Sequence, residues 1–163
     1  MFDLVMIGKV LLLLWIANGA PIIAARILGR RLAIPIDFNF HIADRRPLFG
    51  KSKTWRGIFA AILFTTPAAI LMGLGPGLGF SIAALAMSGD LMSSFIKRRL
   101  GLAASQRATL LDQIPESLLP VLALALQGLI SWPEGLFVVI LFTVSDLLIS
   151  RVLYRLQIRK RPY

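Results

Sequence analysis

The chain has 163 residues, of which 57% are hydrophobic and 16% charged; it carries a formal net charge of +10 and no cysteine. Its mean hydropathy of +0.78 excludes an ordinary soluble domain, and the missing cysteines exclude disulfides, thiolate catalysis and cysteine metal sites. The positive charge is typical of the cytoplasmic loops of a membrane protein, so we do not expect nucleic acid as a partner.

Five apolar runs predict the fold class. A helix needs about 20 residues to cross roughly 30 Å of hydrocarbon. We therefore predict an all-α integral membrane protein with five transmembrane helices, forming a single domain over residues 1–163. The predicted spans are 4–25, 57–74, 78–96, 115–131 and 135–154.

The basic residues predict how the bundle is oriented. They gather in the connections after the first and third spans and in the C-terminal tail, and alternation puts these three segments on one side. The positive-inside rule makes that side cytoplasmic, with the N-terminus outside the cell membrane and the C-terminus inside. The basic residues are Arg30, Arg31, Arg45, Arg46, Lys51, Lys53, Arg56, Lys97, Arg98, Arg99, Arg107, Arg155, Arg159, Lys160 and Arg161.

Two unusual residues interrupt the first span. Pro21 removes a backbone donor and frees a carbonyl one turn earlier, so we expect the helix to kink or break near its cytoplasmic half. Broken helices at membrane depth usually line cavities, which would place Asn18 in one. A tolerated kink, with Asn18 bonded to a neighbouring helix, explains the pattern equally well.

The long cytoplasmic loop from Gly29 to Arg56 is too long for a plain connector. Its apolar residues, Phe38 and Phe40 among them, predict a folded segment that lies on the membrane. Thr54 is placed to cap the second helix and Arg56 to anchor it at the interface. Alternatively, the lysines beside Gly50 bind phosphate at this helix entrance.

Asp90 is the strongest candidate for a functional residue. An ionised carboxylate costs roughly 3 kcal/mol at the centre of a membrane helix, so it is normally kept only where it meets a partner, an ion or water. Helical spacing puts Asp90, Ser94 and Lys97 on one face, with Arg98 beside it. This set suits Mg²⁺ with its bound phosphates. The alternative is a structural ion pair between Asp90 and Lys97.

Further carboxylates lie on the last two spans. Asp112 and Glu116 share a helical face at the start of the fourth span, so with Asp90 they can form a cytoplasmic carboxylate set. Asp112 is also an ordinary N-cap residue, and the two roles are compatible. For Asp146, a structural pair with Arg151 is favoured over metal binding.

A set of short motifs follows in order along most of the chain: Ala17-Asn18-Gly19-Ala20-Pro21, Pro35-Ile36-Asp37, Asp44-Arg45-Arg46, Leu48-Phe49-Gly50, Lys53-Thr54-Trp55-Arg56-Gly57, Gly89-Asp90, Ser94-Phe95-Ile96-Lys97-Arg98-Arg99 and Leu111-Asp112-Gln113. Together these motifs resemble the CDP-archaeol synthase family of membrane cytidylyltransferases. The resemblance implies a five-helix membrane fold and CTP-dependent transfer of a cytidylyl group to a phosphorylated membrane lipid, giving a CDP-lipid and pyrophosphate in phospholipid biosynthesis.

The same resemblance implies roles for particular residues. Asp90 and Asp112 would bind Mg²⁺, and with Lys97 and Arg98 they would form the catalytic set. Nucleotide or phosphate contacts are expected at Asn18, Asp44, Lys53, Thr54, Arg56, Ser94, Lys97 and Arg98. No obligate protein partner is expected. The main alternative function is a small transporter or lipid-translocating module, although no internal repeat supports it.

Overall fold

Five helices account for most of the chain in the computed structural model, which describes residues 2–102, 110–155 and 157. They are α1 (Leu4–Leu28), α2 (Trp55–Leu71), α3 (Pro76–Arg99), α4 (Gln113–Leu126) and α5 (Trp132–Arg155), with no strand in the described residues. This confirms the all-helical class. Of the basic residues that predicted the orientation, 107 and 159–161 lie outside this part.

The helix boundaries follow local sequence signals. Thr54 caps α2 by accepting a hydrogen bond from the Gly57 amide, as predicted. Asp3 caps α1 in the same way through the Met6 amide. Pro76 occupies the first turn of α3, where its missing N–H is not needed. The helix α1 runs unbroken from Leu4 to Leu28 through Pro21, so the predicted break does not occur.

Three of the described helices, α1, α3 and α5, are long and apolar enough to cross a membrane. The other two are shorter than predicted: α2 has 17 residues and α4 has 14. At 1.5 Å per residue these extend about 26 Å and 21 Å, less than the hydrocarbon thickness. The predicted ends at 74 and 131 overran them, because the apolar runs continue into the turns that follow each helix.

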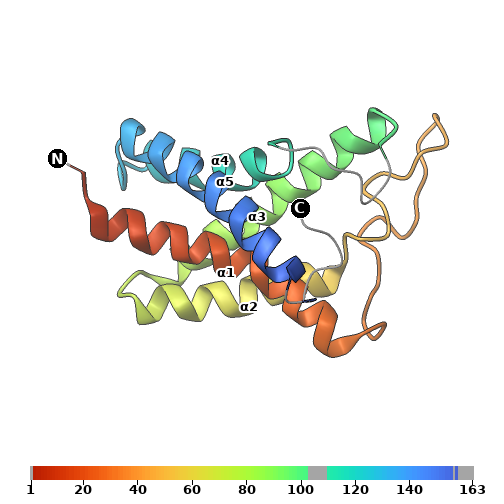
Figure 1. The fold of residues 1–163 in the computed structure, drawn as a ribbon, viewed down its shortest axis with the longest axis horizontal. Coiled ribbons are helices and arrows are strands. Elements are labelled where there is room, and N and C mark those ends of the chain that lie inside the picture. The colour runs from red at the N-terminus through yellow and green to blue at the C-terminus, as the bar shows by residue number, and fades with distance from the viewer. Residues whose placement is uncertain (1, 103–109, 156, 158–163) are drawn as a thin grey trace.

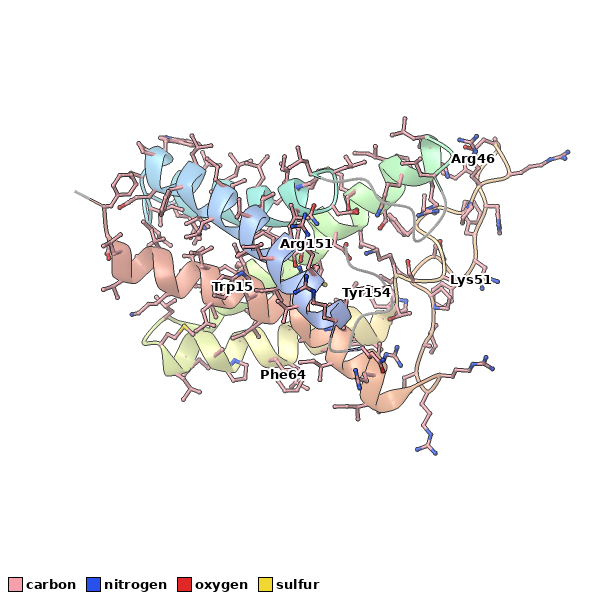
Figure 2. All side chains as sticks on the ribbon, in the orientation of Figure 1. Trp15, Arg46, Lys51, Phe64, Arg151 and Tyr154 are labelled. Carbon is pink, nitrogen blue, oxygen red and sulfur yellow. The ribbon has the colours of Figure 1, made fainter. Side chains whose placement is uncertain are left out.

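The bundle has an apolar interior and an apolar exterior. Each helix packs against the next, and α1 also packs against α3 and α5, enclosing Val10, Leu13 and Phe142. Large hydrophobic side chains, such as Phe64 on α2, are also exposed on the outside (Figure 2). An exterior of this kind suits lipid and not water, which supports the prediction of a membrane protein.

The two ends of the bundle differ (Figure 1). The N-terminus and the short turns that follow α2 and α4 lie at one end, and the loop of residues 29–54 lies at the other. This loop has no helix or strand along its whole length, only the isolated bridges Pro35–Thr54 and His41–Pro47. Arg46 and Lys51 mark this end in Figure 2, which we call the loop end.

Candidate active site

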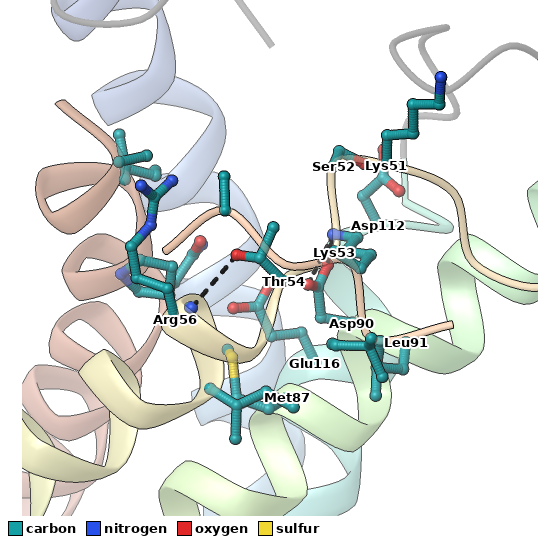
Figure 3. Close-up of a pocket in the computed structure, with 18 of the residues that line it drawn as sticks. Lys51, Ser52, Lys53, Thr54, Arg56, Met87, Asp90, Leu91, Asp112 and Glu116 are labelled. Carbon is teal, nitrogen blue, oxygen red and sulfur yellow. Dashed lines mark hydrogen bonds and ion pairs between the residues drawn. The ribbon is translucent and has the colours of Figure 1, made fainter. Parts of the chain in front are cut away.

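A pocket of about 810 Å³ opens among the helices and the 29–54 loop at the loop end (Figure 3). All five helices or the residues at their ends contribute to its lining. Of the ten residues with a predicted metal, catalytic or nucleotide-binding role, seven line it: Asn18, Lys53, Thr54, Arg56, Asp90, Lys97 and Asp112.

Asp90 and Lys53 form one ion pair in this pocket. The Lys53 ammonium lies 2.5 Å from one Asp90 carboxylate oxygen and 2.6 Å from the other, joining α3 to the loop. Both side chains keep about a quarter of their surface exposed. The pair is therefore open to a ligand, and its ammonium can exchange the carboxylate for another anion.

A second ion pair joins Lys97 of α3 to Asp112 at the start of α4. The alternative in which Lys97 pairs with Asp90 along one helix face is therefore wrong. Asp112 is the N-cap residue of α4, as predicted, but its side chain makes no capping hydrogen bond and pairs with Lys97. Both acidic residues instead point to lysines brought from another element.

A close approach of α3 and α4 brings these pairs together. A Cβ atom added to Gly89 would lie 2.1 Å from the Pro115 carbonyl oxygen and 2.7 Å from the Glu116 Cα atom. Since real Cβ contacts are not that short, only glycine allows this packing. Gly89 is therefore what lets the helix that carries Asp90 meet the beginning of α4.

A polar network forms the inner wall of the pocket. The Asp146 carboxylate accepts hydrogen bonds from Asn18 (3.0 Å) and Gln113 (3.2 Å), which links α5 to α1 and α4. Asp146, Gln113 and Glu116 are all buried and line the pocket. Sequence reasoning favoured a structural pair with Arg151 for Asp146, with metal binding as the weaker alternative, and it assigned no role to Gln113. The signal for Asp146 was the same as for Asp90: a carboxylate within an apolar span.

Three predicted site residues do not line the pocket. Asp44 is exposed and accepts hydrogen bonds from the Arg99 side chain (2.6 Å) and the Arg46 amide (3.1 Å). Arg98 is buried and donates to the Leu102 carbonyl, and Ser94 is 2% exposed. A helical stripe predicts which residues share a face, but it does not predict which neighbour covers that face.

Thr54 and Arg56 both line the pocket, and both also hold the local backbone. Thr54 caps α2 and also lines the pocket. The Arg56 guanidinium donates to the carbonyls of Gly29 (3.0 Å) and Arg31 (2.7 Å), which ties the start of the loop to α2. Capping therefore does not exclude these residues from contact with a ligand.

The carboxylates suit a metal ion that shares its ligands with a substrate. Among the described residues, no three histidine, aspartate or glutamate side chains are close enough to form a protein-only metal site. Asp90 and Asp112 nevertheless line one pocket. Mg²⁺ commonly takes one or two carboxylates, keeps water and obtains other ligands from phosphates, so this donor set fits it.

Asp37 is buried in the loop beside the pocket. Burial raises the pKa of its carboxyl, but hydrogen bonds from the Gly50, Phe49 and Asn39 amides outweigh this and hold the pKa below its ordinary value of 3.8. The unfolded chain therefore takes up the proton first as the pH falls. The stabilisation is complete above the ordinary pKa and is lost as the pH drops below it toward the folded-state pKa.

We therefore expect the thermal stability of the detergent-solubilised protein to contain an acid-sensitive part that depends on Asp37. Between pH 7 and pH 3, the unfolding temperature of wild type should fall more steeply below pH 4 than that of Asp37→Asn, because only wild type has this carboxylate to protonate. Above pH 5, the variant should be less stable by roughly 1.5–3 kcal/mol, the usual worth of hydrogen bonds to a charged group. Parallel curves across the whole range would contradict this assignment.

The fold and the pocket define a helical membrane protein with a pocket at one end that is lined by lysines and carboxylates. Residues 75–163 match the family model described as CDP-archaeol synthase. The CDP-archaeol synthase of Sulfurisphaera tokodaii is 36% identical over 91% of this chain and 89% of its own length, and that of Pyrobaculum calidifontis is 31% identical over 96% and 98%. A solved structure described as an intramembrane enzyme for archaeal membrane lipids biosynthesis has a TM-score of 0.72 and 30% identity over 85% of this chain and 89% of that one.

The chain belongs to the CDP-archaeol synthase family. The predicted family is thereby confirmed, and with it the predicted enzyme class, a CTP-dependent cytidylyltransferase that acts on a lipid phosphate. The alternative of a transporter without nucleotidyl transfer has no support from these relatives.

Proposed function

We propose that the pocket at the loop end binds CTP with Mg²⁺ and transfers its cytidylyl group to a phosphorylated archaeal-type membrane lipid. One observation carries the proposal: the two ion pairs Lys53–Asp90 and Lys97–Asp112 face the same pocket. A site with two ammonium groups and two carboxylates has the charges that a metal-bound nucleotide triphosphate requires.

The reaction needs positioning more than proton transfer. An oxygen of the lipid phosphate attacks the α-phosphorus of CTP, the bond from that phosphorus to the oxygen bridging the β-phosphate breaks, and pyrophosphate leaves with the electron pair. Because the nucleophile is already an anion, no general base is required. Lys53 and Lys97 would neutralise the phosphates and hold them against their repulsion.

Asp90 and Asp112 would hold the Mg²⁺, which when bound supplies positive charge to the nucleotide phosphates. The neighbouring polar network of Asn18, Gln113 and Asp146 would fix the start of α4, and with it Asp112, relative to α1 and α5. Arg98, Ser94 and Asp44 act outside the pocket in this scheme, by stabilising the end of α3 and the loop.

The sidedness and the acceptor have separate support. Lysines and arginines concentrate at the loop end, which favours a cytoplasmic position for the pocket, where CTP is available, and an outward N-terminus. Five membrane crossings would then include the short helices α2 and α4. Apolar residues such as Ile22, Ile58 and Leu91 also line the pocket, which suits a lipid acceptor. The relatives' name points to an archaeol-type lipid.

The proposal predicts pyrophosphate release that depends on both substrates. Purified protein should convert CTP labelled at the α-phosphate into labelled lipid, with one pyrophosphate per CDP-lipid, when Mg²⁺ and a phosphorylated archaeol-type diether are present. Omitting the lipid or adding excess chelator should reduce the rate at least about 100-fold, since either step removes a reacting group or its charge partner. Diacyl phosphatidate in a parallel reaction measures acceptor selectivity. Pyrophosphate release without labelled lipid would refute the transfer.

A further inference from the structure

We propose that Asp37 is a positioning residue that holds the segment 49–53 so that Lys53 faces Asp90 across the pocket. This inference rests on the proposed function, because it assigns to a loop carboxylate the placement of a substrate-binding lysine. Asp37 lies outside the pocket lining, so it would act through Lys53 and not by touching the substrate.

The Asp37 carboxylate binds the backbone of two distant parts of the loop. One oxygen accepts hydrogen bonds from the amides of Phe49 (2.9 Å) and Gly50 (2.8 Å), and the other accepts one from Asn39 (3.0 Å). Asp37 is 6% exposed. The carboxylate thus fixes the chain twelve and thirteen residues further on.

The segment that Asp37 fixes leads directly to Lys53. The Lys53 amide donates to the Gly50 carbonyl (3.1 Å), and the Lys53 carbonyl accepts from the Ile36 amide (2.9 Å). The backbone of Lys53 is therefore held from both sides by residues next to Asp37 or bonded to it. Its side chain then reaches Asp90 on α3 (Figure 3).

The backbone that follows Asp37 adopts an uncommon conformation, which fits a segment held in place by the carboxylate contacts. Phe38 has a φ of 46° and Asn39 a φ of 63°, a left-handed region that asparagine tolerates but that a bulky residue such as phenylalanine rarely adopts. Gly50 also has a positive φ, at 93°. Such strain persists only where surrounding contacts enforce it, and it gathers at functional sites.

Only a carboxylate satisfies this arrangement. Three N–H groups point at the two Asp37 oxygens, and an ionised carboxylate has acceptors alone. In Asp37→Asn an NH₂ group would face at least one of these amides. Asp37→Glu keeps the charge and both acceptors but displaces them by one methylene, so it offers a milder variant that should fold.

A double-mutant cycle tests whether Asp37 acts through Lys53. We expect Asp37→Asn to lower kcat/KM for CTP about 10- to 100-fold, the usual effect of losing a group that orients a ligand-binding side chain, and Asp37→Glu to lower it about tenfold. Lys53→Gln should lower it at least as much. Adding either Asp37 change to Lys53→Gln should lower kcat/KM by less than about a further threefold relative to Lys53→Gln alone. The Lys53 ammonium is then absent, so its placement no longer matters.

Glu134→Gln provides the matched control. Glu134 is also a buried carboxylate that accepts backbone amides, from Asp3 and Ser131 (both 2.7 Å), but at the opposite end of the bundle. It should change stability and leave kcat/KM unchanged. Losses that multiply in the double variants, or wild-type kcat/KM in Asp37→Glu and Asp37→Asn, would overturn the positioning role. Absence of CDP-lipid formation by wild type would instead refute the proposed function.

Discussion

Asp90→Asn is expected to lower CDP-lipid formation by about 10³-fold while the protein remains folded. Removing one electrostatic group from a preorganised site typically costs 10²–10³-fold, and Asp90 is both a candidate Mg²⁺ ligand and the partner of Lys53. The amide keeps the shape of the side chain but removes its charge. The measurement is the initial rate of pyrophosphate release with saturating lipid and a range of CTP and Mg²⁺ concentrations.

The same variant should leave the bundle stable. Asp90 is about a quarter exposed at its side chain, so loss of its pair with Lys53 is worth little to folding, on the order of 1 kcal/mol. The unfolding temperature should therefore stay close to that of wild type, while protection of the fold by CTP with Mg²⁺ is lost. Turnover within tenfold of wild type would exclude a role for Asp90 in metal binding.

The sequence was sufficient to locate the long helices and to single out Asp90 and Asp112, which line the pocket. Long apolar runs have only one structure that satisfies their backbone in lipid, which is why α1, α3 and α5 could be located from hydropathy. Asp90 was recognisable because an ionised carboxylate in such a run is costly unless it meets a partner, an ion or water. The Thr54 cap followed from its position just before the second apolar run.

What the sequence could not predict depends on contacts between elements. Lys97 could be placed on the face of Asp90 by spacing, but its actual partner, Asp112, comes from α4. Pro21 was expected to kink or break α1, yet the helix continues through it and Asn18 bonds to Asp146 on α5, because one missing hydrogen bond can be tolerated in a packed helix. The role of Asp37 depends on amides more than ten residues away, which no local pattern reveals.

The packing of α3 on α4 gives the second large prediction, at Gly89. In Gly89→Ala the new methyl group would lie 2.1 Å from the Pro115 carbonyl oxygen, so the two helices must move apart. Alanine favours a helix over glycine by up to about 1 kcal/mol, but overpacking against a rigid backbone costs roughly 1–3 kcal/mol or more. The clash should therefore exceed the gain, and the free energy of unfolding should fall by about 2 kcal/mol.

The same displacement should also impair catalysis. Gly89 precedes Asp90, and Pro115 and Glu116 follow Asp112 by one turn, so separation of the helices changes the distance between the two candidate metal ligands. A misplacement of about 1 Å costs roughly 100-fold in rate, and kcat/KM for CTP should fall by this amount in the variant that remains folded. Gly8→Ala is the matched control, because a Cβ atom there meets nothing within 4 Å. It should raise stability by about 0.5–1 kcal/mol and leave activity intact. If Gly89→Ala behaved like Gly8→Ala, close contact between α3 and α4 would not be what brings Asp90 and Asp112 together.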